Sequence, residues 1–485
     1  MVDKDLLSIQ EARALVRSAR KAQETLAAYD QAQVDALTRA MAETGESHAR
    51  ELAEMAVADT GFGRAEDKAA KNILASRSLY AHISPMKTMG IIHEDPAKGL
   101  LDIATPAGVI AALIPSTNPT STTLYKAMIG IKAGNAVVFS PHPSAAHCIR
   151  RTVELIQEAL RSQGAPAELV TMMSIPTIEG TAELMKEADL ILATGGPAMV
   201  KAAYSSGTPA LGVGAGNVPA FIERSADIPA ALDRIFQSKT FDNGTVCASE
   251  QAIVTENIIS DVVIRELETR GGYFLSEEEA AKVKPVMERP NGSMNPAIVG
   301  RDAAHIANLA GISIPAGTRI LLYKEKGVGP QFPFSKEKLT ALLGFYTVDN
   351  WEAACELCFK LLKNGGMGHS LAIHSTNDAV IREFALKKPV SRLLVNTPST
   401  QGAVGISTHL PPSFTLGCGA VGGSSTSDNV GPRHLFNIRH VAYDAGTLAP
   451  VSAVGDTPAP ASAPADDVDV EELTRLVMKA LENIK

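Results

Sequence analysis

GVIAALIPSTNPTSTTLYKAMIGIKAGNAVVFSP, residues 108–141, holds two apolar runs separated by a segment with the pattern of a helix. The two runs, 108–115 and 135–141, are continuously apolar, which is typical of strands that are buried on both faces. Between them, residues 120–134 predict a helix that ends at Gly134. A strand, a helix and a second strand in this order predict a parallel sheet that is covered by helices.

The same alternation continues downstream. We predict further helices and strands in alternating order over 145–164, 169–175, 178–188 and 189–196. A second mixed region runs from about 241 to 431, and residues 433–443 predict one more strand. The fold class is therefore α/β.

The segment upstream of the first apolar run has a different pattern. Residues 8–79 are helical in pattern with few breakers, and the charged first segment predicts an amphipathic helix rather than a signal peptide. Residues 86–104 predict a hairpin that turns at 96–99.

Composition and charge exclude several classes of partner. Of the 485 residues, 45% are apolar and 20% are charged, which is the balance of a soluble globular protein with two or three domains. The net charge of −8, with no concentrated basic patch, argues against nucleic acid and anionic membranes as partners. No apolar run approaches the roughly 20 residues of a membrane-spanning helix.

The five cysteines are too few and too scattered for a disulfide framework, so we expect a reducing, cytoplasmic compartment. Cys355 and Cys358 form a CxxC, but they lie in a helical pattern and no second CxxC completes a zinc site. We interpret them as a helix-packing pair and expect no metal site.

The C-terminal composition changes sharply after Tyr443. Residues 446–467 are rich in Pro, Ala, Ser and Gly and predict a flexible linker. Residues 468–485 place their apolar side chains on one helix face, and Asp469 and Glu472 have the spacing of a capping box. This helix either folds back on the parent domain or docks on another protein, and we favour docking.

Cys247, in TFDNGTVCASEQAIV (240–254), is the first candidate for chemistry. It lies in a small, polar turn before a strand-like run, whereas structural cysteines usually lie among apolar neighbours. Asn118 stands between a strand end and a helix start, where its amide either donates to an oxyanion or only turns the chain before Pro119.

Two glycine-containing turns are candidates for contact with a cofactor. The backbone N–H groups of Gly195, Gly196 and the following helix start could hold a diphosphate, although an ordinary tight turn has equal weight. Gly212, Gly214 and Gly216 form no dinucleotide fingerprint, and we interpret them as a loop that needs close backbone approach.

Five motifs together resemble the coenzyme-A-acylating branch of the aldehyde dehydrogenase superfamily. The resemblance covers roughly residues 10–445 and rests on ADTGFGRAEDKAAKN (58–72), IPSTNPTST (114–122), NAVVFSPHPSA (135–145), TFDNGTVCASEQ (240–251) and FTLGCGAVGGSSTSDNVGPRHLFNI (414–438). This branch includes the aldehyde dehydrogenase half of bifunctional aldehyde–alcohol dehydrogenases and the propionaldehyde and acetaldehyde dehydrogenases of bacterial microcompartments.

The resemblance implies an aldehyde dehydrogenase-like fold. In it, residues 1–240 would form a Rossmann-type NAD-binding domain with an oligomerisation hairpin over about 86–104. Residues 241–431 would form the α/β catalytic domain and residues 432–445 an oligomerisation strand, so that the protein would be a homo-oligomer, either a dimer or a tetramer. The helix over 468–485 resembles an encapsulation peptide that binds microcompartment shell or core proteins.

The resemblance also implies roles for single residues. Cys247 falls on the catalytic nucleophile and Asn118 on the oxyanion-stabilising asparagine, while His369 either helps to deprotonate the incoming thiol or is a packing residue. The implied cofactor-binding residues are Ser140, Pro141, His142, Thr194, Gly195, Gly196, Gly214 and Glu337. Cys418 is interpreted as a small packing residue.

One departure from the wider superfamily indicates the reaction. Hydrolytic members carry a glutamate that activates water, but here that position falls near Val213, in a loop without a carboxylate. A general base typically contributes roughly 10²–10⁴-fold, so water should attack an acyl-Cys247 slowly, whereas the thiol of coenzyme A ionises readily. We therefore expect a short-chain aldehyde, with propionaldehyde favoured over acetaldehyde, to be oxidised with NAD and coenzyme A.

Two alternatives remain open at this point. A hydrolytic dehydrogenase would release the free acid, and a non-catalytic scaffold would act only through its C-terminal helix. The segment 140–145 lacks an acidic residue to repel a 2′-phosphate, so NADP could be tolerated in place of NAD.

Overall fold

The computed structural model describes residues 3–290, 292–445 and residue 475. They form two compact units, one made of the residues up to 92 with 102–439, the other of 93–101 with the described residues from 440 onward. The predicted linker over 446–467 and, except for Arg475, the predicted helix over 468–485 lie outside the described residues. Among the described helices, none combines the length and the apolarity that a membrane crossing requires.

The N-terminal segment is helical, as predicted. Its elements are α1 (Lys4–Leu26), α2 (Gln31–Ser47), α3 (Ala49–Thr60), α4 (Ala65–Ile73), the π-helical turn η1 (Leu74–Ser78) and α5 (Leu79–Ile83). The start of α2 is fixed by a capping box, in which the Asp30 carboxylate accepts from the Gln33 N–H and the Gln33 side chain accepts from the Asp30 N–H.

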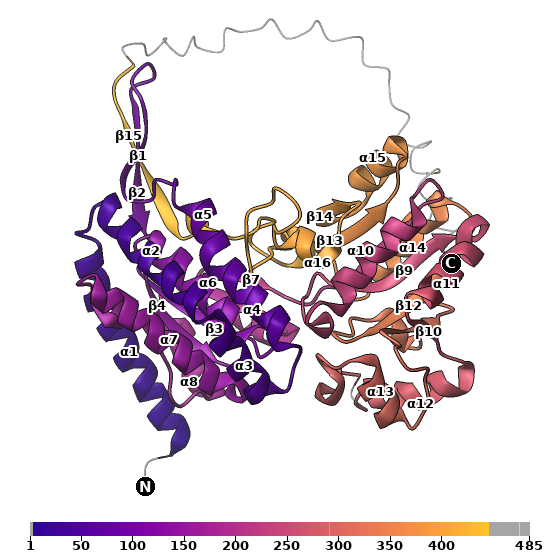
Figure 1. Ribbon diagram of the computed structural model, residues 1–485. Coiled ribbons are helices and arrows are strands. Elements are labelled where there is room, and N and C mark those ends of the chain that lie inside the picture. The colour runs from indigo at the N-terminus through magenta and orange to yellow at the C-terminus, as the bar shows by residue number, and fades with distance from the viewer. Residues whose placement is uncertain (1–2, 291, 446–474, 476–485) are drawn as a thin grey trace, which may run out of the picture. The chain divides into compact units, whose positions relative to one another are not determined.

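A five-stranded parallel sheet with strand order β5-β4-β3-β6-β7 follows in the chain, and Figure 1 shows it with its helices. Every residue of β3 and β4 is buried, which confirms the prediction that helices cover both faces. The elements of this region are β3 (Val109–Ile114), α6 (Pro119–Lys132), β4 (Ala136–Pro141), η2 (Pro143–Ala145), α7 (Ala146–Ser162), η3 (Ala167–Leu169), β5 (Val170–Met172), α8 (Ile178–Glu187), β6 (Leu190–Thr194), α9 (Pro197–Tyr204) and β7 (Ala210–Val213).

A second parallel sheet has seven strands in the order β10-β11-β12-β9-β8-β13-β14. The elements from here to residue 434 are β8 (Val218–Ile222), α10 (Ile228–Thr240), η4 (Phe241–Gly244), β9 (Glu250–Glu256), α11 (Asn257–Thr269), β10 (Gly272–Phe274), α12 (Glu277–Met287), η5 (Pro296–Ile298), α13 (Ala303–Ala310), β11 (Ile320–Lys324), η6 (Pro333–Ser335), β12 (Leu342–Val348), α14 (Trp351–Lys363), β13 (Gly368–His374), α15 (Asp378–Lys387), β14 (Val390–Val395), α16 (Ser399–Ala403), η7 (Ala420–Gly422) and η8 (Pro432–His434).

The seven-stranded sheet is covered on both faces, because side chains alternate along its strands. Ala220 and Ile222 of β8 pack in one apolar cluster, whereas Phe221 between them packs in another. The second cluster also contains Cys355 and Cys358, both buried on α14, as expected for a helix-packing pair.

The chain passes from the first sheet to the second between Val213 and Val218, upstream of the boundary expected at residue 240. The run 218–222 is fully buried and pairs with β9 and β13, so it belongs to the second sheet. The short glycine-containing loop over 214–217 is therefore the connection between the two sheets.

A small three-stranded sheet has the order β1-β2-β15, with β1 at Gly90–Asp95, β2 at Leu100–Pro106 and β15 at Phe436–Ala442. Both the predicted hairpin over 86–104 and the predicted C-terminal strand are confirmed as elements. Within the second compact unit, the Tyr443 N–H donates to the Gly99 carbonyl over 2.9 Å.

Candidate functional site

One cavity collects most of the predicted site residues. It has a volume of about 280 Å³ and is lined by Cys247, Asn118, His142, Thr194, Gly195, Gly196, Gly214 and Glu337 from the predicted set. It is also lined by residues that sequence reasoning had not selected, among them Thr245, Leu339, Val404, Phe414 and Leu416.

The two sheets contribute opposite edges to this cavity. Asn118 follows β3 and Thr194 is the last residue of β6, so both lie at the carboxyl edge of the five-stranded sheet, where ligands of open parallel sheets bind. Cys247 precedes β9 and Glu337 precedes β12, so both come from the amino edge of the seven-stranded sheet. The rule that ligands bind at the carboxyl ends of parallel strands therefore locates Asn118 and Thr194, but it does not locate Cys247 and Glu337.

Cys247 is held in a turn whose backbone is unusual. Asp242 and Asn243 both have φ of 50° and Gly244 has φ of 78°, which places three consecutive residues in the left-handed region. The Ser249 N–H then donates to the Val246 carbonyl over 2.8 Å, closing the turn just before β9. Side chains with little bulk and a turn of this kind leave the Cys247 sulfur partly exposed at the cavity.

Gly216 explains the glycine spacing of the loop between the sheets. A Cβ at Gly216 would lie 2.0 Å from the Cys247 carbonyl oxygen and 3.2 Å from His369 Cγ. Any side chain here would displace the turn that carries the thiol, so the predicted close backbone approach is confirmed at Gly216. At Gly214 it is not, since a Cβ there would meet no heavy atom within 4 Å.

The environment of Cys247 disfavours its thiolate in the free protein. Burial raises the pKa of the Cys247 thiol to about 12, the negative charge of Glu337 adds to the rise, and Arg392 opposes it. Glu337 is itself affected, since burial raises the pKa of its carboxyl to about 7 while the Gly216 N–H and nearby lysines oppose the shift. Glu337 Oε1 accepts from the Gly216 N–H over 3.0 Å.

Asn118 lies beside the turn of Cys247 with both ends of its amide engaged. Its Nδ2 donates to the Thr245 carbonyl over 3.1 Å and to Thr117 Oγ1 over 3.2 Å. Its Oδ1 accepts from Lys71 Nζ over 2.7 Å. The NH₂ end therefore points toward the segment that leads into Cys247.

The cavity has the features of a nucleotide cofactor site. Gly195 and Gly196 precede α9, and a Cβ at Gly196 would meet no heavy atom within 4 Å. The buried Thr194 Oγ1 has no hydrogen-bond partner among the described residues. An open helix start beside an orphaned hydroxyl fits a diphosphate with its adjoining groups.

Three predicted residues do not line this cavity. Ser140 is buried and its Oγ lies 2.8 Å from Thr181 Oγ1, while Pro141 ends β4 in a pair with Ile114. His369 is fully buried behind Gly216, with Nδ1 3.0 Å from Ser370 Oγ. Burial, with Arg392 adding to it, lowers the pKa of His369 to about 3, so the imidazole is a weak base.

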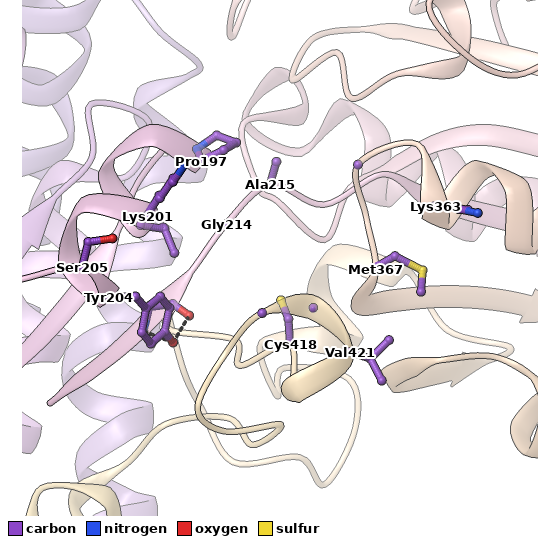
Figure 2. Close-up of a pocket in the computed structure, with 15 residues that line it drawn as sticks. Pro197, Lys201, Tyr204, Ser205, Gly214, Ala215, Lys363, Met367, Cys418 and Val421 are labelled. Carbon is purple, nitrogen blue, oxygen red and sulfur yellow. Dashed lines mark hydrogen bonds between the residues drawn. The ribbon is translucent and has the colours of Figure 1, made fainter.

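A second cavity, of about 490 Å³, adjoins the first and is drawn in Figure 2. The two share Pro197, Gly214 and Ala215 as lining residues. Cys418 lines the second cavity but is buried, as expected for a packing residue. Among the described residues that line either cavity, Glu337 is the only carboxylate, so the loop near Val213 supplies none.

Sequence reasoning missed a set of buried charges beside the site, formed by Lys68, Lys71 and Asp242. Lys68 and Lys71 stand three residues apart in ADTGFGRAEDKAAKN, a motif that supported the resemblance but received no role. The sequence shows only two lysines about one helical turn apart, a spacing that does not distinguish a buried from an exposed pair.

Comparison with known proteins places this geometry in context. The model of the aldehyde dehydrogenase family matches residues 5–321. The bifunctional aldehyde-alcohol dehydrogenase AdhE of Escherichia coli strain K12 is 43% identical over 448 residues, which are 91% of this chain and 50% of that protein. The chain thus spans about half the length of this curated relative.

Two solved structures are similar over nearly their whole length. An acetylating aldehyde dehydrogenase from Geobacillus thermoglucosidasius is 48% identical with a TM-score of 0.90, over 92% of this chain and 98% of that one. A propionaldehyde dehydrogenase from the fucose utilisation microcompartment of Clostridium phytofermentans is 28% identical with a TM-score of 0.81, over 89% of this chain and 97% of that one.

The charge of Glu337 should be measurable through the reactivity of Cys247. In Glu337→Gln the negative charge that raises the thiol pKa is removed, so the pH at which alkylation by iodoacetamide reaches half its limiting rate should fall. Mass spectrometry of the Cys247 peptide across a pH series would measure this. Glu250→Gln is the matched control, because Glu250 is another buried carboxyl whose pKa burial raises to about 7. An equal shift in both variants, or none in Glu337→Gln, would contradict the assignment.

Proposed function

The chain belongs to the aldehyde dehydrogenase family, and we propose that it oxidises a short-chain aldehyde with NAD⁺ and transfers the acyl group to coenzyme A. The observation that carries the proposal is the shared cavity, in which a cysteine, an asparagine amide and a helix-start turn lie together. The similarity to an acetylating aldehyde dehydrogenase supports coenzyme A as the acceptor.

NAD⁺ would be held by groups from both sheets. The N–H groups of Gly195, Gly196 and the start of α9 would bind the diphosphate, and the orphaned Thr194 hydroxyl lies beside them. The Glu337 carboxylate would accept from ribose hydroxyls, with Gly216 N–H fixing its orientation. Ser140 and Pro141 are proposed to lie alongside the adenosine ribose, and His142 is proposed to face the cofactor phosphates. When bound, the nicotinamide ring accepts a hydride.

Acylation begins with addition of the Cys247 thiolate to the aldehyde carbon. This forms a C–S bond and moves the carbonyl electrons onto oxygen, giving a thiohemiacetal alkoxide. The Asn118 Nδ2–H and the Cys247 backbone N–H are the proposed donors to that oxygen, and one such donor is typically worth roughly 10²–10³-fold in rate. Loss of hydride from the carbon then leaves an acyl thioester on Cys247.

Deacylation requires a second nucleophile. The thiol of coenzyme A loses its proton near neutral pH far more readily than water, and its thiolate attacks the thioester carbonyl. The bond to Cys247 breaks, acyl-coenzyme A leaves, and the Cys247 thiolate is restored. Water lacks an equivalent route, because Glu337 is the only carboxylate among the described residues that line the two cavities, and it is proposed to bind ribose. His369, buried behind Gly216, is proposed as a neutral packing residue rather than as the base.

The lining of the cavity favours an uncharged aldehyde. No lysine or arginine occurs among the described residues that line it, and Glu337 is negative when ionised. A carboxylate or sulfonate on the substrate would therefore lose its hydration without gaining a cation. We propose propionaldehyde as the preferred substrate and acetaldehyde as the next, with the apolar Val404, Phe414 and Leu416 against the alkyl group.

The remaining proposals concern assembly and location. The small sheet of β1, β2 and β15 is the proposed oligomerisation element of a dimer or tetramer. Residues 468–485 are proposed to dock on the shell or core of a bacterial microcompartment in the cytoplasm, which the similarity to a microcompartment enzyme supports.

Coenzyme A should control turnover but not the first oxidation. Without coenzyme A, rapid mixing with NAD⁺ and propionaldehyde should give a burst of about one NADH per Cys247, followed by a rate lower by roughly 100-fold. Cys247→Ala should lose the burst and at least roughly 10⁴-fold in turnover. Cys418→Ala removes the cysteine that lines the neighbouring cavity, and its turnover rate should stay within about tenfold of the wild-type rate. Full turnover without coenzyme A would indicate the hydrolytic alternative.

Substrate charge should decide specificity. We expect kcat/KM for propionaldehyde to exceed that for succinate semialdehyde by roughly 100-fold, because the carboxylate enters the cavity without a counter-ion. The comparison is made at saturating NAD⁺ and coenzyme A. Val404→Lys introduces a cation into the cavity and should bring the kcat/KM values of the two aldehydes closer together. A wild-type enzyme that prefers succinate semialdehyde would contradict the proposed pocket.

The C-terminal segment, residues 446–485, should be sufficient to direct a protein to a microcompartment. Residues 446–485 fused to a fluorescent reporter should concentrate it in the shells of cells that form microcompartments. A fusion with Leu473→Glu and Leu481→Glu, which interrupt the apolar face, should be diffuse. Diffuse signal from the unmodified fusion would contradict docking. Turnover of an aldehyde by the full chain would exclude the alternative of a non-catalytic scaffold.

A further inference from the structure

A buried cluster of three charges lies behind Asn118. The ammonium groups of Lys68 and Lys71, from α4, both donate to Asp242 Oδ2, and the Lys68 distance is 2.9 Å. The side chains of Lys68, Lys71 and Asp242 are only 3%, 2% and 0% exposed. Burying charged groups is costly unless they are paired, and here two ammonium groups share one carboxylate. The second buried ammonium therefore needs a reason.

The carboxylate of Asp242 ties its own turn to α4. Besides the two lysines, it accepts from the Arg64 N–H over 2.7 Å and from Thr245 Oγ1 over 2.6 Å. Burial acts to raise the pKa of Asp242, but Lys71 and Lys68 outweigh it and hold this pKa below its usual value. The turn that leads to Cys247 is therefore anchored to the start of α4 by an ionised carboxylate.

The two lysines differ in what else they contact. Lys71 Nζ donates to Asn118 Oδ1 over 2.7 Å, and Thr245 Oγ1 is 3.4 Å away. Lys68 Nζ instead donates to the Thr117 carbonyl over 2.9 Å, and its hydrogen bonds to described residues do not include the Asn118 side chain. Only Lys71 thus joins the carboxylate of Asp242 to the amide that faces the cavity.

An asparagine amide has nearly the same shape at its two ends, so its direction depends on its partners. An ammonium group can only donate hydrogen bonds. The end of the Asn118 amide that faces Lys71 must therefore be the acceptor, Oδ1. The Nδ2 end must then point the opposite way, toward the Thr245 carbonyl and the turn of Cys247. A cation on Oδ1 also polarises the amide and strengthens its N–H donors.

We propose that Lys71 is a positioning residue that fixes the direction and polarity of the Asn118 amide beside Cys247. This rests on the proposed function, since the amide is the proposed donor to the oxyanion. It gives Lys71 of ADTGFGRAEDKAAKN a role in catalysis through Asn118, in addition to its contact with Asp242.

A purely structural role makes a different prediction, and Lys68 provides the matched control. Lys68→Met and Lys71→Met each remove one buried ammonium from the same carboxylate of Asp242, which keeps the other lysine as its partner. Only Lys71→Met removes the donor to Asn118 Oδ1. The two variants therefore separate loss of the cluster from loss of amide orientation.

The test is a double-mutant cycle with Asn118→Ala, read as the rate of the single-turnover NADH burst without coenzyme A. Lys71→Met should slow the burst by roughly 10–100-fold in the wild-type background and by less than about threefold in Asn118→Ala. Lys68→Met should have a smaller effect that is the same in both backgrounds. An equal loss from Lys71→Met with and without Asn118 would overturn the proposal.

A second measurement does not depend on activity. In a crystal structure of Lys71→Met, or of Lys71→Gln if the first variant does not fold, the Asn118 amide should turn away from its wild-type contacts with Thr245. An Asn118 that keeps these contacts would overturn the proposal. A wild-type protein without any NADH burst would instead contradict the proposed function, while the crystal structure still decides the role of Lys71.

Discussion

The buried carboxylate of Asp242 is the interaction on which the site depends. It collects two ammonium groups from α4, a backbone N–H from the start of that helix and the hydroxyl of Thr245. Asp242 also has φ of 50° and is the first of three consecutive left-handed residues in the turn that leads to Cys247. An ionised group at this point holds a strained turn in place and transmits its position to Asn118 through Lys71.

The two sheets give this turn its surroundings. The carboxyl edge of the five-stranded sheet supplies Asn118, Thr194 and the start of α9, and the amino edge of the seven-stranded sheet supplies Cys247 and Glu337. The loop over 214–217 joins the sheets, and Gly216 packs so closely on the Cys247 carbonyl that no side chain fits. The same loop supplies no carboxylate, and the one carboxylate that lines the cavity among the described residues, Glu337, accepts from the Gly216 N–H of this loop.

Much of this was predictable from sequence. The apolar runs around 108–141 identify the parallel sheet, because strands buried on both faces are continuously apolar, whereas half-exposed strands alternate apolar and polar residues. Cys247, Asn118 and Thr194, which the resemblance selected residue by residue, line one cavity in the structure, while their roles stay predictions. The boundary between the sheets was less predictable, because β8 is recognisable as part of the second sheet only through its pairing with β9 and β13.

The buried charges were not predictable in the same way. Lys68 and Lys71 lie in a segment whose pattern is that of an ordinary charged helix, and charged residues of a helix usually face solvent. Their partner Asp242 is 171 residues away from Lys71 along the chain, so no local pattern connects them. The motif of His369 left two roles open, a base for the incoming thiol or a packing residue. Its place behind Gly216, where burial lowers its pKa to about 3, was visible only in the structure.

The central claim is that an acyl group bound to Cys247 leaves by transfer to a thiol and not to water. Intact-protein mass spectrometry after mixing the enzyme with NAD⁺ and propionaldehyde tests it most directly. We predict a propionyl adduct on Cys247 that persists for minutes in thiol-free buffer and disappears within the mixing time once coenzyme A is added, with propionyl-coenzyme A as the product. An adduct that decays to free propionate equally fast in both conditions would contradict the account.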